Sequence, residues 1–178
     1  MPGMTAERIT STPRVDPGTL TGERAALEEW LDFHRATLAM KCEGLDETQL
    51  RTASAPPSDL TLLGLVRHMA EVERGWFRKV LVGDDPGWIF CTPEDRDRDF
   101  HVTDEDTWEE AYAAWQGEIA VARANAAERE LDDVGAGKHR TGETFNLRWI
   151  YLHMIEEYAR HNGHADLVRE RIDGATGD

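Results

Sequence analysis

Cysteine is scarce in this chain, and the two cysteines present, Cys42 and Cys91, lie far apart in the sequence. Such spacing indicates neither a disulfide framework nor a cysteine zinc site. Long apolar runs are also missing: no stretch of about 18 apolar residues occurs, and residues 1–18 lack the apolar segment of a signal sequence. We therefore expect a cytoplasmic protein with neither a signal peptide nor a membrane span.

Positive charge is in short supply as well. The formal net charge is −15, from 35 acidic and 20 basic residues, and only Lys41, Lys79 and Lys138 are lysines. No basic cluster is dense enough to follow a phosphate backbone, so we expect neither a nucleic-acid partner nor binding to an anionic membrane. Hydrophobic residues make up 40% of the chain, which is enough for a packed core.

Strand signals are few, and four segments have helical periodicity instead. These predicted helices cover about residues 22–42, 61–81, 103–128 and 146 onward. The third is predicted to begin at a capping-box pattern formed by Thr103 and Asp106. The sequence thus predicts an all-α fold.

Long connections separate the predicted helices, and such connections occur in bundles that are not simple up-and-down hairpins. We predict a four-helix bundle with long inter-helix loops, two of them ordered at one rim. Residues 1–18 are predicted to be a flexible arm, and residues 19–173 a single domain. Helical bundles of this size often pair, so we expect a homodimer.

Four ionisable side chains, His153, Glu157, His161 and His164, follow one another on the last predicted helix. Because an α-helix turns about 100° per residue, positions four apart lie only roughly 40° from each other, and the first three share one strip. That strip borders the apolar stripe containing Met154. Burying ionisable groups is costly unless something pairs them, and a divalent metal at Glu157 and His161 would do so.

A third ligand is expected from the second predicted helix, where His68 lies near the apolar face between Leu65 and Val72. His34, on the first helix, has no acidic or histidine neighbour on its inner side and competes less well. A simpler alternative stays open at this stage. Glu157 and His161 could form an ordinary i,i+4 pair that contributes only ~0.2–0.5 kcal/mol to helix stability.

Other chemistry-bearing patterns are absent or weak. The sequence contains no HExxH, ExxH, GxSxG, P-loop or GxGxxG pattern. The acidic run at 94–99 lacks the glycine and the terminal glutamate of a calcium loop, so we interpret it as a solvated loop. His34, His101 and His139 are interpreted as structural or surface residues. Trp88, in a Gly/Pro-rich loop, could cap a pocket or anchor the loop.

Two stretches together, LTLLGLVRHMAEVERGWF at 60–77 and NLRWIYLHMIEEYARHNGHADLVRE at 146–170, resemble the DinB/YfiT-like metalloenzyme superfamily. The resemblance covers residues 20–172 and is closest to the actinobacterial mini-circle-protein-like branch. It implies a four-helix bundle with a metal ion held by His68, Glu157 and His161. Many relatives have HxxxH on the last helix, whereas ExxxH resembles the N-terminal domain of mycothiol-dependent maleylpyruvate isomerase. The glutamate favours zinc, with nickel as the alternative.

The resemblance also implies a function. We expect a metal-dependent transferase or isomerase in which the ion activates a low-molecular-weight thiol, mycothiol or bacillithiol, toward an electrophilic small molecule. Water in place of the thiol would make it a hydrolase. His164 and His153 are the expected proton carriers. A different class of function is the alternative: a non-catalytic metal- or ligand-binding bundle, related to stress or dimerisation, in which His153 or His164 completes four protein ligands.

Overall fold

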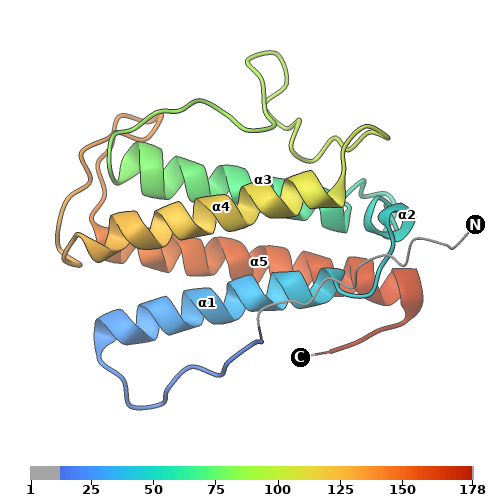
Figure 1. The fold of residues 1–178 in the computed structure, drawn as a ribbon, viewed down its shortest axis with the longest axis horizontal. Coiled ribbons are helices and arrows are strands. Elements are labelled where there is room, and N and C mark those ends of the chain that lie inside the picture. Colours follow the sequence, from blue (N-terminus) through green and yellow to red (C-terminus); the bar gives the residue numbers. More distant parts are fainter. Residues whose placement is uncertain (1–12, 178) are drawn as a thin grey trace, which may run out of the picture.

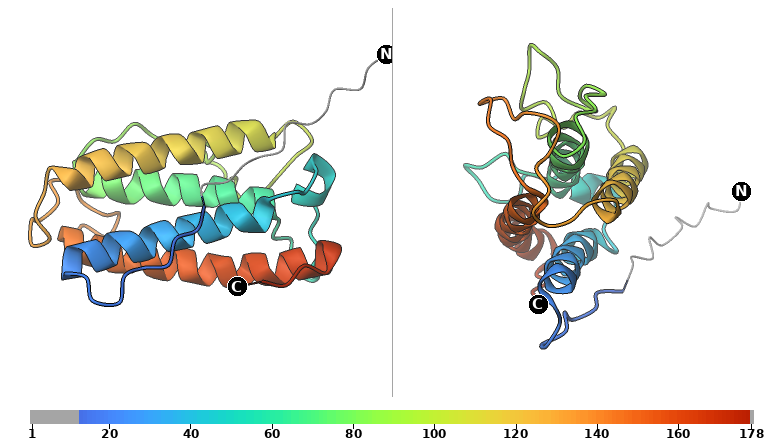
Figure 2. Two further views of the ribbon diagram at one scale, coloured as in Figure 1. Left: turned by 60° about the horizontal axis from the view of Figure 1, so that its bottom comes forward. Right: turned by 90° about the vertical axis from the view of Figure 1, so that its left-hand side faces the viewer.

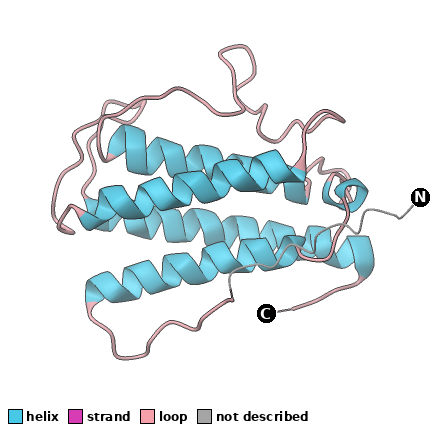
Figure 3. Ribbon diagram, in the orientation of Figure 1, coloured by secondary structure: helices cyan, strands magenta, loops and turns pink. Residues whose placement is uncertain are grey.

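The computed structural model describes residues 13–177, and over that range the chain is helical and contains no strand (Figure 3). The first twelve residues of the predicted arm lie outside the described range. An isolated β-bridge joins Val134 and Asn146. The prediction of an all-α bundle is confirmed. The elements are α1 (Glu23–Cys42), α2 (Glu47–Leu50), α3 (Leu62–Glu73), η1 (Arg74–Val80), α4 (Trp108–Ala127) and α5 (Leu147–Asp173).

The four long helices lie side by side, with α1 and α5 running in one direction and α3 and α4 in the other (Figure 1). α1 packs mainly on α5, and α3 on α4. Because α3 and α4 are parallel, the segment between them, residues 81–107, must travel back along the whole bundle (Figures 1 and 2). No helix in the described part of the chain is long and apolar enough to cross a membrane.

Side-chain caps define where α3, α4 and α5 begin, whereas α1 begins after Gly22, which has no side chain to form such a cap. The hydroxyl oxygens of Thr61 and Thr107 and the carbonyl oxygen of Asn146 each accept a hydrogen bond from a backbone N–H in the first turn. Such caps stabilise a helix by about 1 kcal/mol each. α5 ends at Gly174, whose φ of 77° is the left-handed conformation that glycine adopts without strain.

The predicted start of the third helix is wrong by one turn. α4 begins at Trp108, after the cap Thr107, and not at the capping-box pattern upstream. Asp106 accepts hydrogen bonds from the backbone N–H and the hydroxyl of Thr103, at 2.8 and 2.9 Å. The two residues therefore close a turn that precedes the helix, because Asp and Thr form the same local bonds in both settings.

The second predicted helix is divided in two. α3 keeps α-helical geometry to Glu73, and residues 74–80 form the π-helix η1. A π-helix holds more residues per turn, so the side chains after Glu73 are rotated relative to the stripe of α3. Periodicity in a sequence is read as an average, and it gave no sign of this change. The one-turn α2 was not predicted either.

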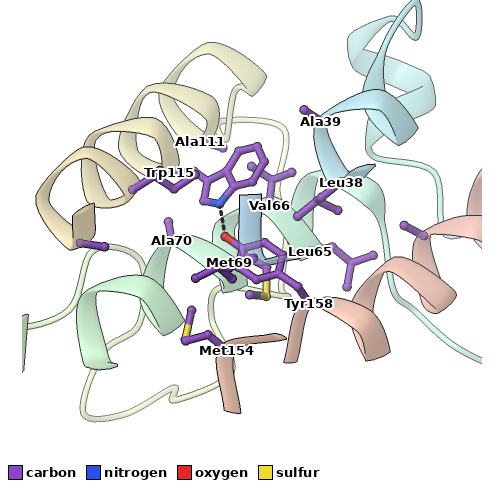
Figure 4. Close-up of a cluster of buried hydrophobic side chains, with 14 of the residues drawn as sticks. Leu38, Ala39, Leu65, Val66, Met69, Ala70, Ala111, Trp115, Met154 and Tyr158 are labelled. Atoms are coloured by element: carbon purple, nitrogen blue, oxygen red, sulfur yellow. Dashed lines mark hydrogen bonds between the residues drawn. The ribbon is translucent and has the colours of Figure 1, made fainter. Parts of the chain in front are cut away.

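A buried polar network joins all four long helices inside the apolar core, and Figure 4 shows its bond between Trp115 and Tyr158 among the apolar side chains. The indole N–H of Trp115, on α4, donates to the Tyr158 hydroxyl on α5 at 2.7 Å, and that hydroxyl donates to Glu73 Oε1 on α3 at 2.7 Å. Arg35, on α1, donates to both oxygens of the same carboxylate, at 2.8 and 2.7 Å. The network fixes how α3 and α5 are aligned.

Candidate metal centre

Two imidazoles and one carboxylate meet between the middle of α3 and the middle of α5. One ligand atom from each of His68, Glu157 and His161 lies within 4.8 Å of the other two. The ring centroids of the two histidines are 4.7 Å apart, and Glu157 Oε2 is 3.5 Å from His161 Nε2. The convergence expected from the sequence is therefore present.

The helical stripes explain this placement. Met154, Tyr158 and Ala165 are fully buried in the core, and Glu157 and His161 lie beside them on α5. His161 is only 8% exposed. The pKa of Glu157 is lowered, first by its hydrogen bond with His161, which outweighs the effect of partial burial. The carboxyl group is thus held ionised, which is the form that binds a cation.

Asp99 completes the surroundings of His68, and the sequence analysis missed it. Its Oδ2 lies 2.8 Å from His68 Nδ1, and its side chain is almost fully buried. When the carboxylate accepts a hydrogen bond from Nδ1–H, the proton of the imidazole stays on Nδ1 and Nε2 is the nitrogen free to bind a metal. The interpretation of 94–99 as solvated is therefore wrong for Asp99. The segment 81–107, called the crossover, packs against α3 at this residue. A contact between a loop and a helix so far apart in sequence leaves no local sequence pattern.

The crossover is also fixed by a carboxylate on α3. Glu71 Oε1 accepts hydrogen bonds from the backbone N–H groups of Ile89, Phe90 and Cys91, with N···O distances of 2.8, 2.6 and 3.0 Å. Further along the same segment, the Phe100 ring stacks on His68 with the centroids 4.3 Å apart. The loop therefore covers one face of the imidazole and shields it from water.

Residues 26–174 of this chain match the family model described as mycothiol-S-transferase. The match runs from within α1 to the end of α5. The chain belongs to the mycothiol-S-transferase family. This family is part of the DinB/YfiT-like superfamily, so the resemblance read from the sequence is confirmed. Among curated proteins, none matches the chain.

The mycothiol-S-transferase family implies a metal ion, and the donor groups of this chain fit one. Two imidazoles and a carboxylate with one open position form a donor set of catalytic zinc sites. Tetrahedral zinc with ligand bonds of about 2.1 Å places its donors about 3.4 Å apart. Glu157 Oε2 and His161 Nε2 are 3.5 Å apart, close to that spacing. A divalent ion is therefore plausible at this site on its chemistry.

The two expected proton carriers lie on either side of these donors. His153 Nε2 is 3.4 Å from Glu157 Oε1, and the imidazole stacks on Trp149. His153 also forms a second group of metal-binding type with Glu156 and the shared Glu157. His164 Nδ1 lies 3.4 Å from a ring nitrogen of His161. Burial, followed by the nearby His161 and Arg160, lowers the pKa of His164.

A cavity of about 630 Å³ opens beside this centre. His68 and Asp99 line it on the side of this centre, and Trp76 and Trp88 are also part of its wall. A cavity of this size accepts a small organic molecule. Trp88, for which the sequence left two roles open, lies in the cavity wall with 49% of its surface exposed.

The remaining histidines lie outside the group of three. His34 contacts Asn162, and its pKa is lowered by burial. His101 pairs with Asp95 on the surface, which raises the pKa of the imidazole. His139 stacks on Trp76 at the cavity wall, with the ring planes only 9° apart.

Proposed function

We propose that this member of the mycothiol-S-transferase family is a metal-dependent enzyme that joins the sulfur of mycothiol to an electrophilic small molecule. Family membership implies a metal-dependent thiol transferase. The observation that carries the proposal is the convergence of His68, Glu157 and His161 beside a cavity large enough for a small organic substrate. A thiol transfer that uses a metal ion to activate the sulfur requires an ion-binding site next to a space for the electrophile.

We assign the metal to His68, Glu157 and His161, and zinc is the ion that this donor set favours, with nickel as the alternative. A divalent ion bound there lowers the pKa of a coordinating thiol, so that the sulfur is a thiolate near neutral pH. Asp99 holds the His68 imidazole in one tautomer and one orientation through Nδ1. Phe100 keeps water from one face of that ring.

The remaining step is proton removal. His164 has a lowered pKa, so it is neutral at pH 7, and a neutral ring nitrogen can accept the thiol proton. His153, which contacts the Glu157 carboxylate, is the second carrier in this scheme. The overall reaction forms a carbon–sulfur bond, expels the leaving group with its electron pair, and transfers the thiol proton to a histidine and then to solvent.

Metal content provides the first test. Protein purified without a histidine tag is expected to hold about one zinc ion per chain, as a site with three protein ligands and one open position does. Glu157→Gln and His161→Ala are expected to lose most of that zinc. His34→Ala removes an imidazole away from the site and serves as the matched control. Retention of full zinc by both site variants would contradict the assignment.

Turnover provides the second test. The zinc-loaded protein is mixed with mycothiol and a chlorodinitrobenzene, and the thioether product is followed by absorbance. Conversion of the aryl chloride to the dinitrophenol, at a rate unchanged after all small thiols are removed, would identify hydrolysis instead of transfer. A zinc-loaded protein with four protein ligands and no turnover would support the non-catalytic binding bundle. Loss of the thiol-dependent rate in His164→Ala, with zinc retained, is expected if His164 accepts the proton.

A further inference from the structure

Charged side chains of both signs line the cavity beside His68. Four are carboxylates, of which Glu71 accepts from three backbone N–H groups, Asp85 pairs with Lys79 and Asp99 pairs with His68, and the fourth is Asp97. Five of the 20 lysines and arginines of the chain line this cavity, although the chain as a whole has a net charge of −15. Local charge of this kind guides which ligands enter a cavity. The five are Arg74, Lys79, Arg96, Lys138 and Arg140.

Some of these cations are already paired and others are not. Arg74 pairs with Glu118 at 2.6 Å, and Lys79 pairs with Asp85 at 2.7 Å. Lys138 and Arg140, in the loop between α4 and α5, form no ion pair within residues 13–177. Arg96, in the segment 81–107, also forms no ion pair within the described residues. An anionic group in the cavity would therefore find three cations without an ion pair, and two of them, Lys138 and Arg140, lie together on one loop.

The segment that carries these two cations is fixed in place. The N–H groups of Ala136 and Gly137 donate to the carbonyls of Leu81 and Val80, each at 3.0 Å. A Cβ at Gly137 would lie 1.8 Å from the carbonyl oxygen of Lys79, so only glycine allows this approach. The next residues, 138–140, are thereby held over the cavity, with His139 stacked on Trp76 at 5.3 Å between centroids.

Besides charged side chains, the cavity wall contains aromatic side chains. Trp76 and Trp88 both line the cavity, and about half of the Trp88 surface is open to solvent. Trp76 is itself covered by other rings: His139 stacks on it, and Trp149 and Phe145 pack against it at 5.2 and 5.4 Å between centroids, which leaves Trp88 as the open indole. Indole faces bind flat rings by offset stacking and edge contacts. The cavity thus combines flat apolar walls with unpaired positive charge.

We propose that the electrophile taken by this enzyme is a flat aromatic compound that carries a carboxylate or a sulfonate. Its ring lies against Trp88, the exposed indole of the cavity wall, and its anionic group lies near Lys138 and Arg140. This proposal rests on the proposed thiol-transfer function, because it names the second substrate of the same site. The aromatic carbon that carries the leaving group then faces the His68 end of the cavity.

The reaction with such a substrate is balanced without any further reagent. The thiol sulfur forms a bond to the ring carbon, and chloride leaves that carbon with the bonding electron pair. The thiol proton goes to a histidine and then to solvent. One thiol and one aryl chloride thus give one thioether, one proton and one chloride ion.

The test measures initial rates of thioether formation with a chloronitrobenzoate and with the chloronitrobenzamide of the same ring pattern. Each rate is corrected for the uncatalysed reaction of that compound with the thiol. The zinc-loaded protein is expected to have a lower KM for the anion. Lys138→Gln/Arg140→Gln is expected to raise that KM about three- to tenfold and to leave the amide unchanged, since partly exposed ion pairs contribute about 0.5–1.4 kcal/mol.

Matched variants separate the local charge from total charge. Arg140→Gln is compared with Arg123→Gln, which removes one exposed cation on α4 outside this cavity. Only Arg140→Gln is expected to weaken the preference for the anion. Trp88→Ala is expected to raise the KM of both aromatic compounds and to leave the ratio between them unchanged. An increase in the KM for mycothiol, with the electrophile KM unchanged, would overturn the assignment of this cavity.

Binding is measured separately from turnover. The benzoate and the benzamide are titrated into the zinc-loaded protein without thiol, and quenching of tryptophan fluorescence reports their dissociation constants. Tighter binding of the benzoate, lost in Lys138→Gln/Arg140→Gln, supports the inference even if no thioether forms, an outcome that would count only against the thiol-transfer function. Equal affinities for the two compounds would overturn the inference whether or not the enzyme turns over.

Discussion

Two aspartates on the crossover show how strongly the role of a single residue depends on its partner. Asp97 is exposed, whereas Asp99, two positions later, is only 3% exposed and accepts from His68. Both belong to one acidic run of the sequence. Of these two aspartates, Asp99 is the one that reaches His68, because the segment 81–107 meets α3 there.

Replacement of Asp99 by alanine is expected to weaken zinc binding. The loss of a carboxylate that orients a metal-binding histidine lowers metal affinity about 10- to 100-fold. Competition with a chromophoric chelator measures the zinc dissociation constant. Asp97→Ala is the matched control and is expected to keep the affinity of the unmodified protein. Equal affinities in the two variants would show that His68 does not depend on Asp99.

The two thiols are expected to react slowly. Burial raises the pKa of both Cys42 and Cys91 to about 12. Since only the thiolate attacks a disulfide reagent, the rate should rise about tenfold per pH unit from pH 7 to 10 with no plateau. Ellman's reagent and absorbance measure this rate. In urea-unfolded protein the thiols return to a pKa of about 8.5 and react quickly, which is the control. A plateau below pH 10 in folded protein would contradict the expectation.

At the scale of elements, the loop between α4 and α5 is held by a close contact between its backbone at residues 135–137 and the backbone at the end of η1. Gly135 and Gly137 lie against the carbonyl groups at the end of η1. Because α4 and η1 are packed together, the loop cannot move away from the end of η1 without losing these hydrogen bonds. The glycines therefore determine where the cationic residues that follow them lie.

Two glycine-to-alanine substitutions should have opposite effects on stability. Gly137→Ala is expected to lower the free energy of unfolding by about 1–3 kcal/mol, because the added Cβ would displace backbone atoms. Gly117→Ala, on α4, meets no atom within 4 Å and should raise it by about 0.5–1 kcal/mol through helix propensity. Urea titrations followed by circular dichroism give both values. A neutral effect of Gly137→Ala would mean that the loop is free to shift.

At the scale of the whole molecule, the Arg35–Glu73 pair is the point where the four long helices are joined. Glu73 is fully buried and accepts hydrogen bonds from Arg35 and Tyr158. Trp115 is joined to it indirectly, because its indole N–H donates to the Tyr158 hydroxyl. Burial raises the pKa of the Tyr158 hydroxyl well above its usual value, with the Glu73 charge as a further cause. That hydroxyl therefore stays protonated and remains a donor throughout the neutral range.

Removal of one member of this pair should cost more than removal of both. Glu73→Leu leaves the Arg35 guanidinium buried without its carboxylate and is expected to lower the free energy of unfolding by about 3–5 kcal/mol. Arg35→Met/Glu73→Leu removes both charges and should recover most of that loss. Urea denaturation of the two variants measures the difference. If the double variant is as unstable as the single one, the pair is not the source of the effect.

Much of the geometry of the candidate metal site could be predicted from the sequence, because its main determinants are local. The apolar stripes place Met154 and Tyr158 in the core, and the i,i+4 spacing then sets Glu157 and His161 side by side. His68 followed in the same way from its place near the stripe of the second helix. The helical fold class was predictable for the same reason.

The tertiary structure alone decided what the loops contribute. Asp99 meets His68, and Lys138 and Arg140 meet the aromatic cavity, across separations in sequence that no periodic pattern spans. The π-helix and the true start of α4 also depended on packing, since the same residues satisfy the local hydrogen-bond rules in either arrangement. Helical spacing is set by the backbone within a few residues, whereas the position of a returning loop is set by the surface that it covers.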